Sequence, residues 1–184
     1  AEHSNSERLK TSAYFTRKDI AYSVIKDLPE LKKKKKIRIL EPSVGVGNFI
    51  PLLFEKYENK DEVILDVCDI DNNSLQILKT ILSKITVPKN FKINFKHTDF
   101  LLWNCKTKYD IVVGNPPYGK ITKNKKLLDL YKSKANNSNT NNIFSFFIEK
   151  SLRLGNYVSL IVPKSLLNAP EFNKTRDLLK NCDL

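Results

Sequence analysis

The chain has 184 residues, 41% of them hydrophobic, which is enough to form the core of one domain. No apolar run reaches the length of about 18 residues that a membrane-spanning helix needs, and the N-terminus lacks the apolar segment of a signal peptide, so we expect no membrane association. The net charge of +12 favours a polyanionic partner, although a general bias toward lysine and asparagine would produce the same charge.

The three cysteines, Cys68, Cys105 and Cys182, are widely spaced and match neither a disulfide framework nor a zinc-binding pattern. They indicate a reducing compartment, and we expect a cytoplasmic protein without a bound metal. The sequence contains no methionine, not even at position 1, so we expect a trimmed chain or an excised fragment.

Helical and extended patterns alternate along the chain. Apolar residues recur at helical spacing in residues 14–28, and Asp19 suits the first turn of that helix. Further on, the patterns predict strands at 37–43, 62–71, 91–100, 109–115 and within 156–167, and helices at 47–57, 73–85, 139–154 and 171–183. Strands that alternate with helices predict a parallel sheet covered on both faces. We expect loops at 120–134, which is rich in lysine, and at 135–142, which we expect to be flexible.

The ends of the first two strands carry candidate binding residues, because open parallel sheets bind ligands at the carboxyl ends of their strands. After the first strand, Gly45 and Gly47 permit a tight turn and a close approach of a ligand. The third glycine of the dinucleotide-binding fingerprint is absent. After the second strand, Asp69 can accept hydrogen bonds from the hydroxyls of a ribose. Asp71 or Asn72 can cap the following helix, and we assign this role to Asp71.

The third strand ends in Asp99 and Phe100. This pair can offer a carboxylate to an exocyclic amine and a ring that stacks on a base, although packing in the core would equally explain Phe100.

The fourth strand runs into Gly-Asn-Pro-Pro-Tyr, residues 114–118. One interpretation is a strand terminator, because proline cannot donate a hydrogen bond in a central strand. However, a residue before proline is held extended, so Asn115 and Pro116 form a stiff segment whose oxygens point beyond the strand end. Together with the ring of Tyr118, two fixed acceptors suit a planar group that carries an NH2.

In this order, the strand ends resemble those of the S-adenosylmethionine-dependent amino-methyltransferases, and in particular the N6-adenine DNA methyltransferases of γ motif order. SAYFTRKDIAYSVI resembles the leading cofactor motif, with Thr16 at its threonine position and Arg17 where the family often has proline. ILEPSVGVGNF resembles the methionine-moiety loop, DVCDID the ribose motif, TDFLLW the adenine motif and NPPY the catalytic motif. The resemblance covers nearly all of residues 13–184, which we expect to be the catalytic domain, and leaves 1–12 as an N-terminal tail.

The resemblance implies an α/β, Rossmann-like class I methyltransferase fold with a mostly parallel sheet that lacks the final antiparallel hairpin. It implies that Asn115, Pro116 and Tyr118 are catalytic. It implies that S-adenosyl-L-methionine is bound by Thr16, Glu41, Pro42, Ser43, Val44, Gly45, Asp69, Ile70, Asp99, Phe100 and Pro117. The implied reaction is direct methyl transfer to the N6 amino group of an adenine that is flipped out of double-stranded DNA.

The family fold continues past residue 184 with the hairpin and a target-recognition domain. We therefore expect an excised catalytic fragment or one half of a split enzyme, with DNA specificity in a missing domain or a separate subunit, within a restriction–modification system. The basic segment 120–134 is expected to contact DNA phosphates.

Three alternatives share part of this pattern. Protein glutamine N5-methyltransferases of release factors and rRNA guanine N2-methyltransferases also carry Asn-Pro-Pro-Tyr, since an amide NH2 satisfies the same two acceptors. The Thr16 motif favours the DNA enzymes, and the long helical leader of the glutamine enzymes is missing. The third alternative is a non-catalytic subunit that binds cofactor or DNA in a split methyltransferase, against which the intact segment 115–118 argues.

Overall fold

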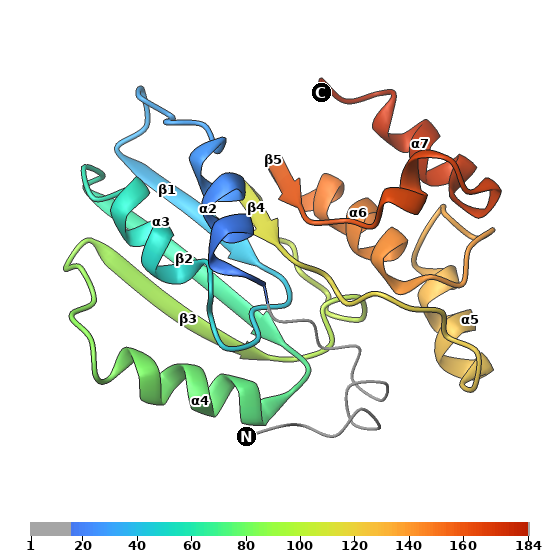
Figure 1. The fold of residues 1–184 in the computed structure, drawn as a ribbon, viewed down its shortest axis with the longest axis horizontal. Coiled ribbons are helices and arrows are strands. Elements are labelled where there is room, and N and C mark those ends of the chain that lie inside the picture. The colour runs from blue at the N-terminus through green and yellow to red at the C-terminus, as the bar shows by residue number, and fades with distance from the viewer. Residues whose placement is uncertain (1–15, 184) are drawn as a thin grey trace.

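The computed structural model describes residues 16–183, so the predicted tail, 1–12, and the first residues of the leading motif lie outside the described residues. Five parallel strands form one sheet in the order β3-β2-β1-β4-β5 (Figure 1). The strands are β1 (Lys36–Glu41), β2 (Glu62–Asp69), β3 (Phe91–His97), β4 (Tyr109–Gly114) and β5 (Gly155–Leu160). The predicted α/β fold with a parallel sheet is confirmed.

Helices cover both faces of this sheet (Figure 1). They are α2 (Lys18–Lys26), α3 (Ile50–Lys56), α4 (Asn72–Leu82), α5 (Lys125–Ser133), α6 (Ile143–Leu154) and α7 (Asn173–Leu179), with the short 3-10 helices η1 (Lys164–Leu167) and η2 (Pro170–Phe172) before α7. Between residues 16 and 183, none of these helices is long and apolar enough to cross a membrane.

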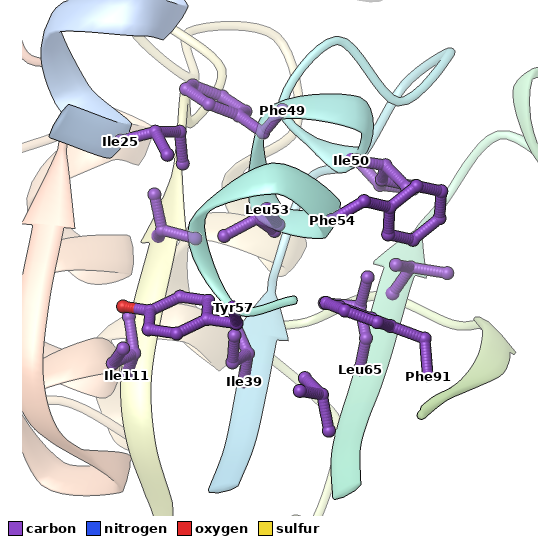
Figure 2. Close-up of a cluster of buried hydrophobic side chains, with 14 of the residues drawn as sticks. Ile25, Ile39, Phe49, Ile50, Leu53, Phe54, Tyr57, Leu65, Phe91 and Ile111 are labelled. Atoms are coloured by element: carbon purple, nitrogen blue, oxygen red, sulfur yellow. The ribbon is translucent and has the colours of Figure 1, made fainter. Parts of the chain in front are cut away.

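The two faces of the sheet have separate apolar clusters. Side chains of α2, α3 and α4 pack on one face, and side chains of α5 and α6 pack on the other. Figure 2 shows the first cluster, in which Phe49, Ile50, Leu53, Phe54 and Tyr57 lie over Ile39, Leu65 and Ile111 of three neighbouring strands. The central strands are therefore buried on both sides, as expected for a parallel sheet.

Helix α5 was not predicted, because the lysines of 120–134 were interpreted as a loop. The segment has the signals of a helix: Asn124 caps the first turn, with its side-chain oxygen 3.0 Å from the backbone nitrogen of Leu127. Leu128 and Tyr131 are buried at helical spacing against the second cluster. The lysines occupy the outer face, so a basic composition concealed an amphipathic helix.

The flexibility of the loop 135–142 stays a prediction, and the structure joins this loop to two helices. The Glu149 carboxylate of α6 accepts hydrogen bonds from the backbone nitrogens of Asn136 (2.8 Å) and Asn137 (2.9 Å). The side chain of Asn137 is buried and donates to the hydroxyl of Thr175 on α7 (2.6 Å). The loop is therefore anchored by buried polar contacts, which cost free energy when they are broken.

The turn between β1 and α3 has the backbone geometry that its glycines were expected to allow. Gly45 and Gly47 have φ angles of 53° and 85°, in a region of backbone conformation that residues with a Cβ rarely adopt. A Cβ on Gly47 would lie 2.5 Å from Leu78 Cδ1 and 3.0 Å from Ile50 Cδ1, both buried, whereas a Cβ on Gly45 would have no heavy atom within 4 Å.

We predict that Gly47→Ala destabilises the protein more than Gly45→Ala. Both alanines adopt a positive φ, which costs about 1–2 kcal/mol, and only Ala at 47 also overpacks the core, which adds about 1–3 kcal/mol. Urea denaturation of the two variants measures the difference. Equal free energies of unfolding, or the reverse order, would contradict the role assigned to Leu78 and Ile50.

Candidate active site

The candidate site lies where β1 and β4 separate at their carboxyl ends, because the strand order reverses direction between these two strands. Pro42, just after β1, packs against Gly114, since a Cβ on that glycine would lie 3.3 Å from Pro42 Cδ. The Ser43 hydroxyl donates to the backbone oxygen of Asn115 over 3.0 Å. These contacts join the loop after β1 to the start of Asn-Pro-Pro-Tyr.

The Asn115 side chain is held on both sides of its amide group. Its nitrogen donates to the Thr16 hydroxyl (3.1 Å), and its oxygen accepts from the Tyr118 hydroxyl. The Tyr118 hydroxyl also lies 3.0 Å from the backbone oxygen of Ile161, just after β5. Because a carbonyl oxygen has two lone pairs, the Asn115 oxygen can accept a second hydrogen bond in a fixed direction.

The role of the Tyr118 hydroxyl was missed in the sequence, where only its ring was considered. The ring packs edge-on against Phe144 of α6, with ring centres 6.3 Å apart, and is half-buried. Stacking of this ring on a target base stays a prediction.

A cavity opens beside Asn115 over the loop after β1. Six of the predicted site residues line it: Thr16, Glu41, Ser43, Val44, Gly45 and Asn115. Val46, Asn48 and Phe49 also line it and were not predicted. Asn48 donates from its side chain to the backbone oxygen of Thr16 (3.1 Å), so it fixes the segment that carries the Thr16 hydroxyl.

Glu41 is the last residue of β1 and is only 1% exposed. Within residues 16–183, its Oε2 atom has no hydrogen-bond partner, although the residue lines the cavity. Burial raises the pKa of the Glu41 carboxyl well above its ordinary value, and the nearby Asp69 carboxylate raises it further. A ligand that brings hydrogen-bond donors or positive charge would satisfy this atom.

Asp69, at the end of β2, faces the same loop. Its Oδ2 accepts from the backbone nitrogen of Gly45 (2.8 Å), and its Oδ1 accepts from that of Asp71 (2.9 Å). Burial raises the pKa of the Asp69 carboxyl, while these backbone hydrogen bonds oppose the shift. The predicted cap is confirmed, since the Asp71 side chain accepts from the backbone nitrogens of Asn73 and Ser74 at the start of α4. Ile70 is 66% exposed, which leaves apolar surface beside Asp69.

The Asp99–Phe100 pair lies outside this cavity. Phe100 is 2% exposed, and its ring centre is 5.0 Å from that of Phe147 on α6. The structure thus places Phe100 in the core, and its role as a stacking ring stays a prediction. Pro117 is half-buried and also lies outside the lining of the cavity.

Lys150 holds the loop after β3 and was not predicted. Its ammonium donates to the backbone oxygens of Phe100, Leu101 and Trp103 and lies 5.0 Å from the centre of the Phe100 ring. Burial lowers the pKa of Lys150 to about 8. Its partners lie about fifty residues away in the sequence, so no local motif indicates this contact.

Residues 8–184 match the family described as Eco57I restriction-modification methylase. The chain belongs to this family. Its sequence is 28% identical over 177 residues to the type II methyltransferase M.CvrRI of Paramecium bursaria Chlorella virus XZ-6E, covering 96% of this chain and 42% of the relative. It is 27% identical to the type II methyltransferase M.VspI of Vibrio sp. (strain 343), covering 94% of this chain and 42% of the relative.

A solved structure from Listeria monocytogenes, described as a class I S-adenosylmethionine-dependent methyltransferase, has the same fold. It superposes with a TM-score of 0.76 at 20% identity, over 92% of this chain and 52% of that protein. The Rossmann-like class I methyltransferase fold is therefore confirmed. The chain spans less than half the length of the two type II methyltransferases.

The residues around the cavity fit the cofactor that this fold implies. S-adenosylmethionine carries an α-ammonium group, which matches the buried oxygen of Glu41 that has no partner among residues 16–183. Its ribose hydroxyls are donors for the carboxylate of Asp69, which has lone pairs beyond the two that the backbone uses.

We predict that Glu41→Gln makes the ligand-free protein more stable at neutral pH. The folded-state pKa of Glu41 lies above 4.5, the ordinary pKa of a glutamate carboxyl, which we take for the unfolded state. Between pH 4.5 and the raised pKa, the folded state therefore binds more protons than the unfolded state. The stability contributed by this carboxyl therefore falls as pH rises through that window, by up to about 1.4 kcal/mol per pH unit. Denaturation of parent and variant from pH 4 upward tests this.

The difference between parent and variant should be small below pH 4.5 and should grow with pH until the raised pKa is passed. A difference that does not change with pH would mean that folding does not raise the pKa of the Glu41 carboxyl. Calorimetry with S-adenosylmethionine should show weaker binding to the variant, because the amide carries no charge to pair with an ammonium.

Proposed function

We propose that this chain is the catalytic part of an N6-adenine DNA methyltransferase that uses S-adenosylmethionine. The observation that carries the proposal is the placement of the Asn115 amide between Thr16, which lines the cofactor cavity, and Tyr118. Membership of a restriction–modification methylase family supports DNA as the substrate. The residues that select the DNA sequence would lie in the part of the protein that its longer relatives possess beyond this chain.

In this proposal, polar groups at three strand ends bind the cofactor, Glu41 from the lining of the cavity and Asp69 and Asp99 from outside that lining. Glu41 accepts from the ammonium, Asp69 accepts from the ribose, and Asp99 accepts from the amine of the adenine. The exposed side chain of Ile70 offers an apolar surface to the same nucleoside. When bound, S-adenosylmethionine supplies an electrophilic methyl group on its sulfonium.

Asn115 and Pro116 act on the target amine. The lone pair of this amine is conjugated with the base, so the amine is a poor nucleophile. Two acceptors, the Asn115 side-chain oxygen and the Pro116 carbonyl, would pull its hydrogens out of the ring plane and aim the lone pair at the methyl group. Because Thr16 and Tyr118 already fix the Asn115 amide, this orientation costs little reorganisation during the reaction.

DNA would approach over α5, which follows Asn-Pro-Pro-Tyr directly. Lys123, Lys125 and Lys126 are exposed at the start of this helix, and within the described residues no acidic side chain pairs with them. Lys120 instead pairs with Glu171 at 3.0 Å, and Lys132 donates to Asn141. The three unpaired lysines are therefore the ones that we assign to phosphates.

We expect Asn115→Ala to lower the single-turnover rate of methyl transfer by about 100-fold or more, the scale for loss of one preorganised polar group. Its affinity for S-adenosylmethionine, measured by calorimetry, should stay within a few-fold, since Glu41 and Asp69 are unchanged. The rate is measured in the full-length protein with labelled cofactor and duplex DNA, followed by mass analysis of the nucleosides.

Tyr118→Phe is the graded comparison. It keeps the ring but removes the hydroxyl that holds the Asn115 oxygen, so the rate should fall by about 2- to 10-fold, the scale of one hydrogen bond. Methylated cytosine, or a parental rate in Asn115→Ala, would reject the proposed function.

Replacing Lys123, Lys125 and Lys126 by Gln should weaken binding to duplex DNA uniformly across sequences. The slope of log affinity against log salt concentration should fall by about one unit per lost phosphate contact. Fluorescence anisotropy between low and physiological salt measures this slope. The matched control replaces Lys32, Lys33 and Lys35, which are also exposed but lie before β1, at the amino ends of the strands. Equal effects of the two triple variants would mean that DNA affinity depends only on the net charge of the protein and not on the position of these lysines.

A further inference from the structure

The carboxylate of Asp99 has a defined orientation, because two groups of the protein hold its two oxygens. Oδ1 accepts from the backbone nitrogen of Leu101 at 2.9 Å, within the same loop. Oδ2 accepts from the hydroxyl of Tyr131 at 2.6 Å. Tyr131 belongs to α5, which follows Asn-Pro-Pro-Tyr in the sequence. A short hydrogen bond from a hydroxyl to a carboxylate is among the stronger hydrogen bonds in proteins.

Tyr131 itself is fixed in place. It is 4% exposed on the inner face of α5, and its ring packs against Phe146 of α6, with ring centres 6.1 Å apart. Burial raises the pKa of the Tyr131 hydroxyl, and the hydrogen bond to Asp99 raises it further, so the hydroxyl keeps its proton and remains a donor near neutral pH. The aromatic side chain thus delivers one directed donor to one carboxylate oxygen.

The rest of the loop does not depend on Tyr131. Lys150 holds the backbone oxygens of Phe100, Leu101 and Trp103 from α6. Loss of the Tyr131 hydroxyl therefore leaves the loop in place, but the Asp99 carboxylate is then held at Oδ1 alone, so its intrinsically broad terminal torsion is less restricted.

We propose that Tyr131 is a positioning residue for recognition of the cofactor's adenine, because it turns Asp99 so that a remaining lone pair meets the exocyclic amine. This inference rests on the proposed function, in which Asp99 accepts from that amine. The oriented carboxylate accepts from a 6-amino purine and repels a 6-oxo purine, whose oxygen offers no hydrogen. Tyr131 thereby sets the preference for an adenosyl over an inosyl cofactor.

The chain contains a matched control for the removal of this hydroxyl. The Tyr109 hydroxyl donates to Asp66 Oδ2, also at 2.6 Å, and Tyr109 is 1% exposed. It lies at the amino end of β4, away from the strand ends that form the site. Tyr109→Phe therefore removes a similar buried hydrogen bond without touching Asp99.

The experiment measures calorimetric affinities of the parent chain, Tyr131→Phe and Tyr109→Phe for S-adenosylhomocysteine and S-inosylhomocysteine. Tyr131→Phe should weaken binding of the adenosyl ligand by about 3- to 10-fold, the scale of one hydrogen bond, and change binding of the inosyl ligand by less than about twofold. The preference for adenosyl should fall accordingly. Tyr109→Phe should keep the parental preference, and Tyr131→Phe should have no further effect on the preference in an Asp99→Ala background.

Two results would overturn the inference while leaving the proposed function intact. One is an unchanged preference in Tyr131→Phe, and the other is an equal loss for both ligands, which a merely structural role of Tyr131 predicts. Failure of the parent chain to bind S-adenosylhomocysteine at all would overturn the proposed cofactor, and the inference with it.

Discussion

The position of β1 between β2 and β4 is the constraint on which the rest of the molecule depends. Because β1 is paired on both sides and all strands are parallel, their carboxyl ends meet at one edge of the sheet. The chain leaves β1 toward one face, where α2, α3 and α4 pack, and leaves β4 toward the other, where α5 and α6 pack (Figure 1). The loops after β1 and β4 diverge at this point, and they bring Glu41 and Asn115 to the same cavity.

This arrangement buries two carboxyl groups, and burial disfavours their ionised forms. Burial raises the pKa of both carboxyls, Asp69 raises that of Glu41 further, and one Glu41 oxygen finds no partner in the described part of the chain. Apolar residues would stabilise such a position, so stability alone does not account for it. A site that holds unsatisfied acceptors ready for a ligand avoids reorganising them on binding, at the expense of the free protein.

The parts of the fold that follow local rules could be predicted from the sequence. The strands show alternating or continuous apolar patterns, the glycines after β1 adopt positive φ angles, and Asp71 caps α4. Glu41 and Asn115 lie together because motif order on a parallel sheet determines which strand ends meet, and Thr16 joins them from the segment before α2.

The remaining features depend on contacts between distant segments, which leave no local pattern. Lys150 reaches the loop after β3, and Tyr131 reaches Asp99, from helices that follow Asn-Pro-Pro-Tyr in the chain. Helix α5 was missed for a different reason, because its lysines outweighed the helical spacing of Leu128 and Tyr131. The core position of Phe100 is set by Phe147, which sequence alone could not pair with it.

The strand order also limits which strands can pair first during synthesis. β1, β2 and β3 are consecutive in the chain and adjacent in the sheet, so they can assemble with α3 and α4 as soon as they leave the ribosome. The other edge of β1 stays open until β4 has been synthesised, and an open edge invites pairing with another chain. Pairing of β1 with β4 closes the longest loop between any two paired strands of this sheet, and such distant pairings are slow to form. Asn115 follows β4, so the candidate site is complete only after β4 has paired with β1.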